Sequence, residues 1–175
     1  RAESEKLKPR VAEKQEIQIS ETVIEAFENA NFAHLHNHSQ YSILQSTSDI
    51  KSLVQKAGEL NMPALAITDL GNLMAAFHFE KAVTKYNKEL EKECADALKA
   101  GEVFNKKQIL PIIGCAFNVC ANHLDKSRQD NGAQVVLLAK NKNGYQNLTK
   151  LTSIANTDGF YYVPRIDRNL IEKYK

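Results

Sequence analysis

The sequence predicts an α/β protein with a mainly parallel sheet. Apolar runs of strand length alternate along the chain with segments whose apolar residues recur every three or four positions. Alternation of this kind requires crossover connections, which join parallel strands. The chain has 175 residues, of which 43% are hydrophobic and 25% are charged, enough for the core of one domain. This composition excludes globally disordered and collagen-like classes.

Composition also limits partners and compartment. With 23 Lys and Arg against 21 Asp and Glu, the net charge of +2 is too close to neutral to indicate nucleic-acid or membrane binding by itself. No apolar run approaches the roughly 18 residues of a membrane span, and the first ten residues lack the apolar core of a signal peptide. Cys94, Cys115 and Cys120 cannot all pair within one chain, which suits reduced thiols. We therefore expect a cytoplasmic protein with no membrane partner.

The ends of the chain suggest a piece of something longer. The sequence begins at Arg1 rather than Met and stops at Lys175 directly after a charged helical run. The alternative is a processed or tagged protein. Residues 1–30 are expected to form a charged N-terminal arm and a short helix capped by Ser20.

Residues 31–175 supply the alternating elements. Apolar runs predict strands at 32–36, 64–68, 109–121 and 135–139, the last as a buried strand. Helical periodicity predicts helices at 49–60, 73–100, 142–156 and 169–175. Ser48 is the expected cap of the first of these helices, and Gly101 ends the second. The second half of that long helix is mostly charged, so we expect a projecting insertion at about 84–108 with few core contacts.

Three histidines stand close together at the end of the first predicted strand. His34, His36 and His38 have the period of a strand, so they are expected to share one face. Imidazole is a common ligand of zinc, iron and manganese, and two histidines at i and i+2 can bind one ion. The alternative is a metal-free strand end whose imidazoles bond to their neighbours.

Asp69 ends the next predicted strand. In a parallel sheet, the carboxyl ends of neighbouring strands lie together, so its carboxylate could complete a metal site with the histidines. A turn or a helix cap would use the same residue equally well.

Other candidate functional residues are supported by weaker sequence patterns. Cys115 and Cys120 are five residues apart, the wrong spacing for a zinc knuckle, and we expect them to pack as small apolar groups. A second set of candidates could contact a phosphate backbone: Lys140, Lys142, Tyr161, Tyr162 and Arg165. The alternative is that these are ordinary surface charges and half-buried aromatic residues.

Five blocks follow one another along the chain: FAHLHNHSQYSIL, LNMPALAITDLGN, PIIGCAFNV, VVLLAKNKNGYQNLTKL and GFYYVPRID. Together they resemble the PHP (polymerase and histidinol phosphatase) family. The last two blocks resemble the branch at the front of the bacterial replicative DNA polymerase III alpha subunit. The resemblance covers about residues 31–175, apart from the insertion at about 84–108, and does not cover residues 1–30.

This resemblance implies part of a distorted (β/α)7 barrel, truncated on its C-terminal side. Active members hold up to three metal ions at the strand ends and hydrolyse phosphoesters, in some polymerases as a 3′–5′ proofreading activity. By position, His36, His38 and Asp69 match metal ligands of the family.

Three other family ligands are replaced in this sequence. Leu70 stands where active members usually have His, Ala116 where they have an acidic residue, and Gln134 nearest the place of another His. Leu and Ala cannot bind a metal. The three remaining ligands are therefore expected to form a degenerate site that holds at most one zinc or manganese ion, without catalytic residues.

The expected role is a structural or docking module in DNA replication, within a DNA-directed DNA polymerase (a nucleotidyltransferase). The resemblance implies the rest of the alpha subunit as a partner, a proofreading exonuclease as another, and DNA through the parent polymerase. Open sheet edges predict self-association of the piece. The alternatives are a metal-dependent phosphoesterase or 3′–5′ exonuclease, and a PHP-like binding protein outside any polymerase.

Overall fold

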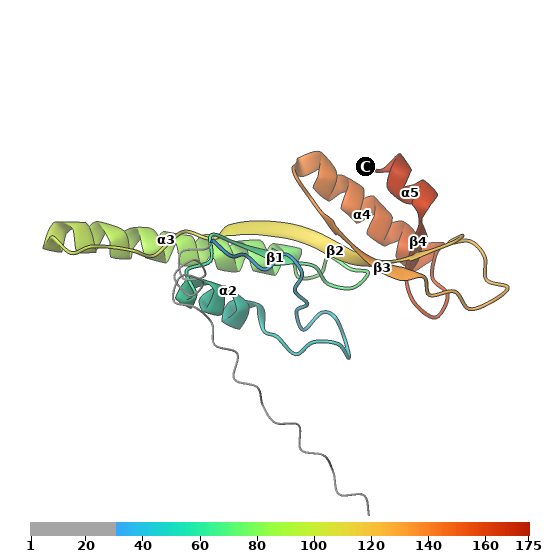
Figure 1. The fold of residues 1–175 in the computed structure, drawn as a ribbon, viewed down its shortest axis with the longest axis horizontal. Coiled ribbons are helices and arrows are strands. Elements are labelled where there is room, and N and C mark those ends of the chain that lie inside the picture. The colour runs from blue at the N-terminus through green and yellow to red at the C-terminus, as the bar shows by residue number, and fades with distance from the viewer. Residues whose placement is uncertain (1–30) are drawn as a thin grey trace, which may run out of the picture. The chain divides into compact units, whose positions relative to one another are not determined.

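A long central strand organises residues 31–175, the part of the chain that the computed structural model describes (Figure 1). The helices are α2 (Ile50–Glu59), α3 (Ala76–Ala100), α4 (Lys142–Thr157) and α5 (Arg168–Lys173). The strands are β1 (Ala64–Ile67), β2 (Leu110–Cys120), β3 (Ala133–Leu138) and β4 (Arg165–Asp167). The arm and the Ser20-capped helix expected at 1–30 lie outside the described residues. Within residues 31–175, no helix has the length and apolarity needed to cross a membrane.

The sheet is mostly parallel, as predicted. Strand β2 pairs in parallel with β1 through its first half and with β4 through its last residues, and it pairs antiparallel with β3. The Ala116 N–H donates to the Asp69 carbonyl, and backbone groups of alternate residues point to the same edge of a strand. Strands β1 and β4 therefore follow one another along one edge of β2, and β3 occupies the other edge.

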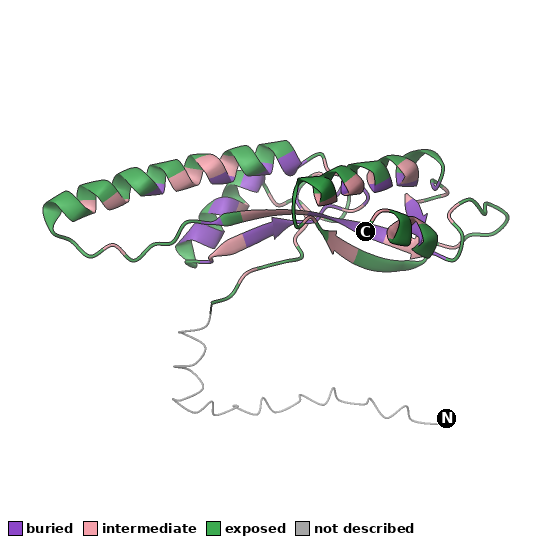
Figure 2. Ribbon diagram, turned by 90° about the horizontal axis from the view of Figure 1, so that it is seen from above, coloured by how far each residue is buried: buried purple, intermediate pink, exposed green. Residues whose placement is uncertain are grey.

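Two groups of helices build two cores against this sheet, and the buried residues lie along the strands and the inner turns of the helices (Figure 2). Helices α2 and α3 enclose the first core with β1; its central residues include Val54, Leu65, Phe79 and Val83. Helix α4 packs on β2 and β4 around Phe117, Leu151 and Ile166. The apolar periodicity of the predicted helices thus marks the faces that are buried.

The cap of α2 differs from the prediction. The Asp49 carboxylate, rather than Ser48, accepts a hydrogen bond of 3.1 Å from the Ser52 N–H. Asp and Ser serve equally well as N-caps, so neighbouring candidates are not distinguished by residue type.

The predicted strand at 32–36 is wrong as a strand. Only His34 forms an isolated parallel bridge, to Leu65 of β1. Three residues later, the Asn37 side chain donates to the Ala66 carbonyl, and the Asn37 N–H donates to the Thr68 hydroxyl. Side-chain bonds thus accompany a few backbone bonds, and the segment runs beside β1 without becoming a strand.

The strand predicted at 135–139 is present as β3, but the prediction that it is buried is wrong. Strand β3 is antiparallel, and within the described residues its outer edge has no strand partner. The side chains of Val135 and Leu138 are 37% and 39% exposed. An apolar run of this length is therefore compatible with an edge strand of a partly covered sheet.

Helix α3 extends well past the sheet (Figure 1). Its last buried residue is Leu90, and Gly101 ends it with a left-handed φ of 74°. The Asn87 side chain also bonds to both backbone groups of Ile109 on the returning segment. The exposed projection therefore begins after Leu90, later than the predicted insertion.

Candidate functional site

The candidate site lies at the carboxyl end of β1, where the segment carrying the histidines runs alongside that strand. The Ala66 N–H donates to the His34 carbonyl, and the Thr68 N–H donates to the Asn37 carbonyl. These bonds place His36 and His38 next to Asp69, the second residue after the end of β1.

The His36 and His38 rings face each other through their Nε2 atoms, which are 3.1 Å apart. Two nitrogens bound to one ion at about 2.1 Å, with an angle of about 90–109°, are separated by about 3.0–3.4 Å. The observed separation fits either a shared ion or a single N–H···N hydrogen bond. His34 is not part of this pair, because its ring packs edge-on against Phe32. Of the three histidines, His36 and His38 therefore form the pair at this site.

The Asp69 carboxylate is buried and already bound by hydrogen-bond donors. Its side chain is only 2% exposed. Oδ1 accepts from the Ser39 N–H and the Ser42 hydroxyl, both at 2.6 Å, and Oδ2 accepts from the Ser39 hydroxyl at 2.7 Å. Three donors compensate the burial of this charge and leave little of the carboxylate for a metal.

Ser42 links Asp69 to His38 and fixes the tautomer of the imidazole. The single hydroxyl proton of Ser42 is donated to Asp69, so its oxygen must accept from His38 Nδ1 at 3.1 Å. The proton of neutral His38 is therefore assigned to Nδ1, which leaves a lone pair on Nε2 facing His36. Fixing of one ring nitrogen by an outer hydrogen bond is typical of histidines that bind metals.

The protonation of His38 follows from its surroundings. Burial lowers the pKa of His38 below its usual value, and the neighbouring His36 lowers it further, while Asp69 acts in the opposite direction. A neutral imidazole with a free Nε2 lone pair is the form that binds a cation.

The nitrogens of His36 and His38 are the groups at this site that could coordinate an ion. His36 and His38 can offer two nitrogens, with water completing the coordination. Among residues 31–175, no group of three or more His, Cys, Asp or Glu side chains is arranged to hold a metal. The Asp69 carboxylate is turned toward the two serines.

The three residues expected to replace family ligands lie on or beside the strands. Leu70 and Ala116 form a parallel bridge, and Ala116 is completely buried. Gln134 lies on β3 opposite Asn118, two residues further along β2 from Ala116. Apolar side chains therefore occupy the strand ends beside Asp69.

Arg165 does not contribute to a phosphate-binding surface, which corrects that prediction. Its guanidinium is fully buried and donates to the backbone carbonyls of Asp130, His123, Asp125 and Gly159. These contacts fasten the loop between β2 and β3 to β4.

The other residues considered for phosphate binding or for a zinc site lie in different environments. Tyr161 lies near the Arg165 guanidinium, Tyr162 is exposed, and Lys140 and Lys142 are surface residues. Cys115 and Cys120 are buried with free thiols, as predicted. Burial raises the pKa of Cys115 to about 12, so this thiol stays protonated.

Ser39 and Ser42 are the site residues that the sequence did not reveal. Both follow the histidines directly, in HSQYS, but serine is so common in loops that no carboxylate partner can be assigned from spacing. The sequence also does not reveal a direct His–carboxylate pair: His123 Nδ1 lies 2.5 Å from Oδ2 of Asp167, and these residues are 44 positions apart.

The fold and the site define an α/β protein with a histidine pair at the strand ends. A family model of the PHP domain matches residues 34–175. The chain belongs to the PHP domain family.

Its relatives include DNA polymerase III subunit alpha of Chlamydia pneumoniae, 41% identical over 80% of this chain and 10% of the relative. The proteins of the same name from Borreliella burgdorferi and Helicobacter pylori are 41% and 33% identical, over 83% and 84% of this chain and 11% and 10% of theirs. The chain thus spans about a tenth of the length of these relatives.

Proposed function

We propose that this chain is the PHP module of a replicative DNA polymerase III alpha subunit and that it acts in docking and structure rather than in catalysis. The observation that carries the proposal is the Asp69 carboxylate, which already accepts three hydrogen bonds from Ser39 and Ser42. The similarity to alpha subunits supports the role in replication.

The chemistry of phosphoester hydrolysis supports a non-catalytic role. Metal-dependent hydrolysis uses ions to polarise the phosphoryl oxygen and to lower the pKa of a bound water. Here His36 and His38 would hold one zinc or manganese ion, and Ser42 would keep the Nε2 lone pair of His38 directed at it. Leu70 and Ala116 supply no ligand for a second ion.

We also propose that the domain is the first part of a (β/α)7 barrel. Parallel pairing of β1 and β4 along one edge of β2 is compatible with the first part of a (β/α)7 PHP barrel. The outer edge of β3, unpaired within residues 31–175, would then receive further strands of a longer domain. The isolated chain would use the same edge to self-associate.

The partners proposed for the module are the rest of the alpha subunit and a separate proofreading exonuclease, with DNA reached through the polymerase. The fraction of the relatives that the chain covers supports the first of these. Coexpression with the remaining alpha subunit should give a complex that survives purification; independent elution of the two parts would contradict the docking role.

The second candidate function is a metal-dependent phosphoesterase or 3′–5′ exonuclease. The His36 and His38 Nε2 atoms are 3.1 Å apart, a separation that also fits two ligands of one metal ion. An assay with manganese on single-stranded DNA and on p-nitrophenyl phosphoesters separates the two. We expect no hydrolysis. Hydrolysis that is lost on His36→Ala or His38→Ala would replace the docking proposal by the enzymatic one.

A further inference from the structure

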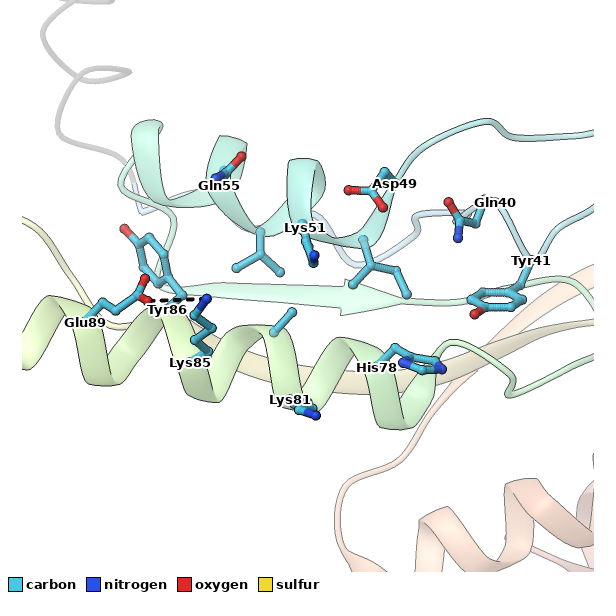
Figure 3. A pocket seen from close by; sticks show the side chains of 13 residues that line it. Gln40, Tyr41, Asp49, Lys51, Gln55, His78, Lys81, Lys85, Tyr86 and Glu89 are labelled. Atoms are coloured by element: carbon cyan, nitrogen blue, oxygen red, sulfur yellow. Dashed lines mark ion pairs between the residues drawn. The ribbon is translucent and has the colours of Figure 1, made fainter.

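A groove between α2 and α3 has features that the strand-end site does not use (Figure 3). It has a volume of about 670 Å³, and its floor includes the aliphatic side chains of Ile50, Val54 and Ala82. This volume lies within the range of about 300–1,000 Å³ that is typical of small-molecule sites. The groove is therefore large enough for a ligand of nucleotide size.

The walls of the groove carry an excess of positive charge. Lys51 from α2 and Lys85 from α3 point into the space between the helices, and Lys81 lies at its rim (Figure 3). Of the two carboxylates that line it, Asp49 is already bonded to the first turn of α2. Glu89 approaches Lys85 at 3.6 Å, with side chains 59% and 77% exposed, and such exposed pairs contribute little. The ammonium groups are thus available to an anionic ligand.

Two parallel rings lie at one end of the groove. The ring centroids of Tyr41 and His78 are 6.2 Å apart, and the ring planes differ by 8°. Tyr41 is anchored against the core, whereas His78 is exposed, so the pair can be extended by another planar ring. Aromatic side chains next to cationic ones are the combination that binds single nucleotides along a strand.

We propose that this groove binds a nucleotide, with its base stacked on the Tyr41–His78 pair and its phosphate between Lys51 and Lys85. Lys85 follows His78 by seven residues, about 10 Å along the helix axis, and its long side chain can span part of this distance. The aliphatic floor would contact the sugar. An acidic peptide would use the lysines but not the rings, so the two features together favour a nucleotide. This proposal is independent of the metal site.

The test is a titration of the 175-residue chain, followed by NMR, with thymidine 5′-monophosphate, the single strand dT10 and inorganic phosphate as probes. We expect saturable shifts of groove residues with both nucleotide probes and weaker ones with phosphate. Comparable affinities for the two nucleotide probes identify a free nucleotide as the ligand, and tighter binding of dT10 identifies a single strand. Absence of saturable binding of either nucleotide probe would overturn the proposal.

Substitutions in the groove test whether the nucleotide binds there. Lys51→Gln, Lys85→Gln and His78→Ala, all at solvent-facing positions, should each weaken binding about fivefold or more. Lys92→Gln, an exposed position on the same helix outside the groove, should change it less than twofold. An equal effect of Lys92→Gln, or no effect of His78→Ala, would show attraction by charge alone and overturn the proposal. A polyglutamate peptide that competes as well as the nucleotide probes would also overturn the proposal, because it would identify the groove as a site for acidic peptides.

Discussion

Ser42 and Asp69 are joined by a hydrogen bond of 2.6 Å from the serine hydroxyl to Oδ1 of the carboxylate. The two residues lie 27 positions apart and connect the histidine-bearing segment to the end of β1. Because the same hydroxyl oxygen accepts from His38 Nδ1, one contact both compensates a buried charge and orients an imidazole. The serine therefore connects the buried carboxylate to the histidine pair.

Ser42→Ala should lower the free energy of unfolding by about 1–3 kcal/mol, because a buried carboxylate loses a donor. Urea denaturation measures the change. Ser153→Ala, at an exposed position on α4, is the control and should remain within about 0.5 kcal/mol of the unsubstituted chain. Equal effects at both positions would mean that the Ser42 bond contributes nothing specific.

Leu90→Ala should destabilise the chain by about 2–4 kcal/mol, since Leu90 is 4% exposed and its truncation leaves a cavity. Leu98, two turns further along α3, is 69% exposed. Leu98→Ala should therefore change the stability by less than about 0.5 kcal/mol. Thermal unfolding of the two variants locates the end of the packed part of α3, and a large loss at Leu98 would extend the core into the projection.

Asp167→Asn should destabilise the chain more at pH 5 than at pH 3. Burial alone would raise the pKa of Asp167, but hydrogen bonds from His123 and from the Leu170 N–H hold it below its usual value. A carboxylate with a lowered folded-state pKa stabilises the fold above its unfolded pKa of about 3.9, and this contribution is lost as the pH falls through the folded value.

Denaturation at the two pH values measures this difference. Asp96→Asn, on the exposed part of α3, is the control and should show a small effect at both. A loss for Asp167→Asn that is as large at pH 3 as at pH 5 would show that the charge of Asp167 is not responsible.

The isolated chain should self-associate through the outer edge of β3. Its backbone groups have no strand partner among residues 31–175, and Val135 adds exposed apolar surface. Val135→Lys should shift the population toward monomer, because edge lysines oppose strand pairing. Sedimentation velocity measures both. A stable monomer of the unsubstituted chain would show that this edge needs no partner.

Periodicity and residue type were sufficient to predict most elements. The helix at 142–156 and the strand at 64–68 have apolar patterns that leave few alternatives, and both are present with nearly these bounds. The strand predicted at 32–36 is wrong, because the segment forms only one isolated bridge to β1 and is also held there by side-chain bonds of Asn37 and Thr68. No local pattern encodes a contact between residues 31 positions apart.

The site was predictable in its titratable residues but not in its connections. The sequence predicts His36, His38 and Asp69 at the ends of two neighbouring strands, and they do lie together at the end of β1. That Asp69 bonds to Ser39 and Ser42 depends on how a loop folds over the strand end. Arg165 shows the same limit, since its charge predicted a surface role while its guanidinium binds backbone carbonyls inside.

Metal content per chain tests the central claim most directly. Elemental analysis after loading with zinc or manganese and gel filtration should find at most about one ion, lost in His36→Ala and His38→Ala. Two or three ions per chain, retained through gel filtration, would contradict a degenerate site.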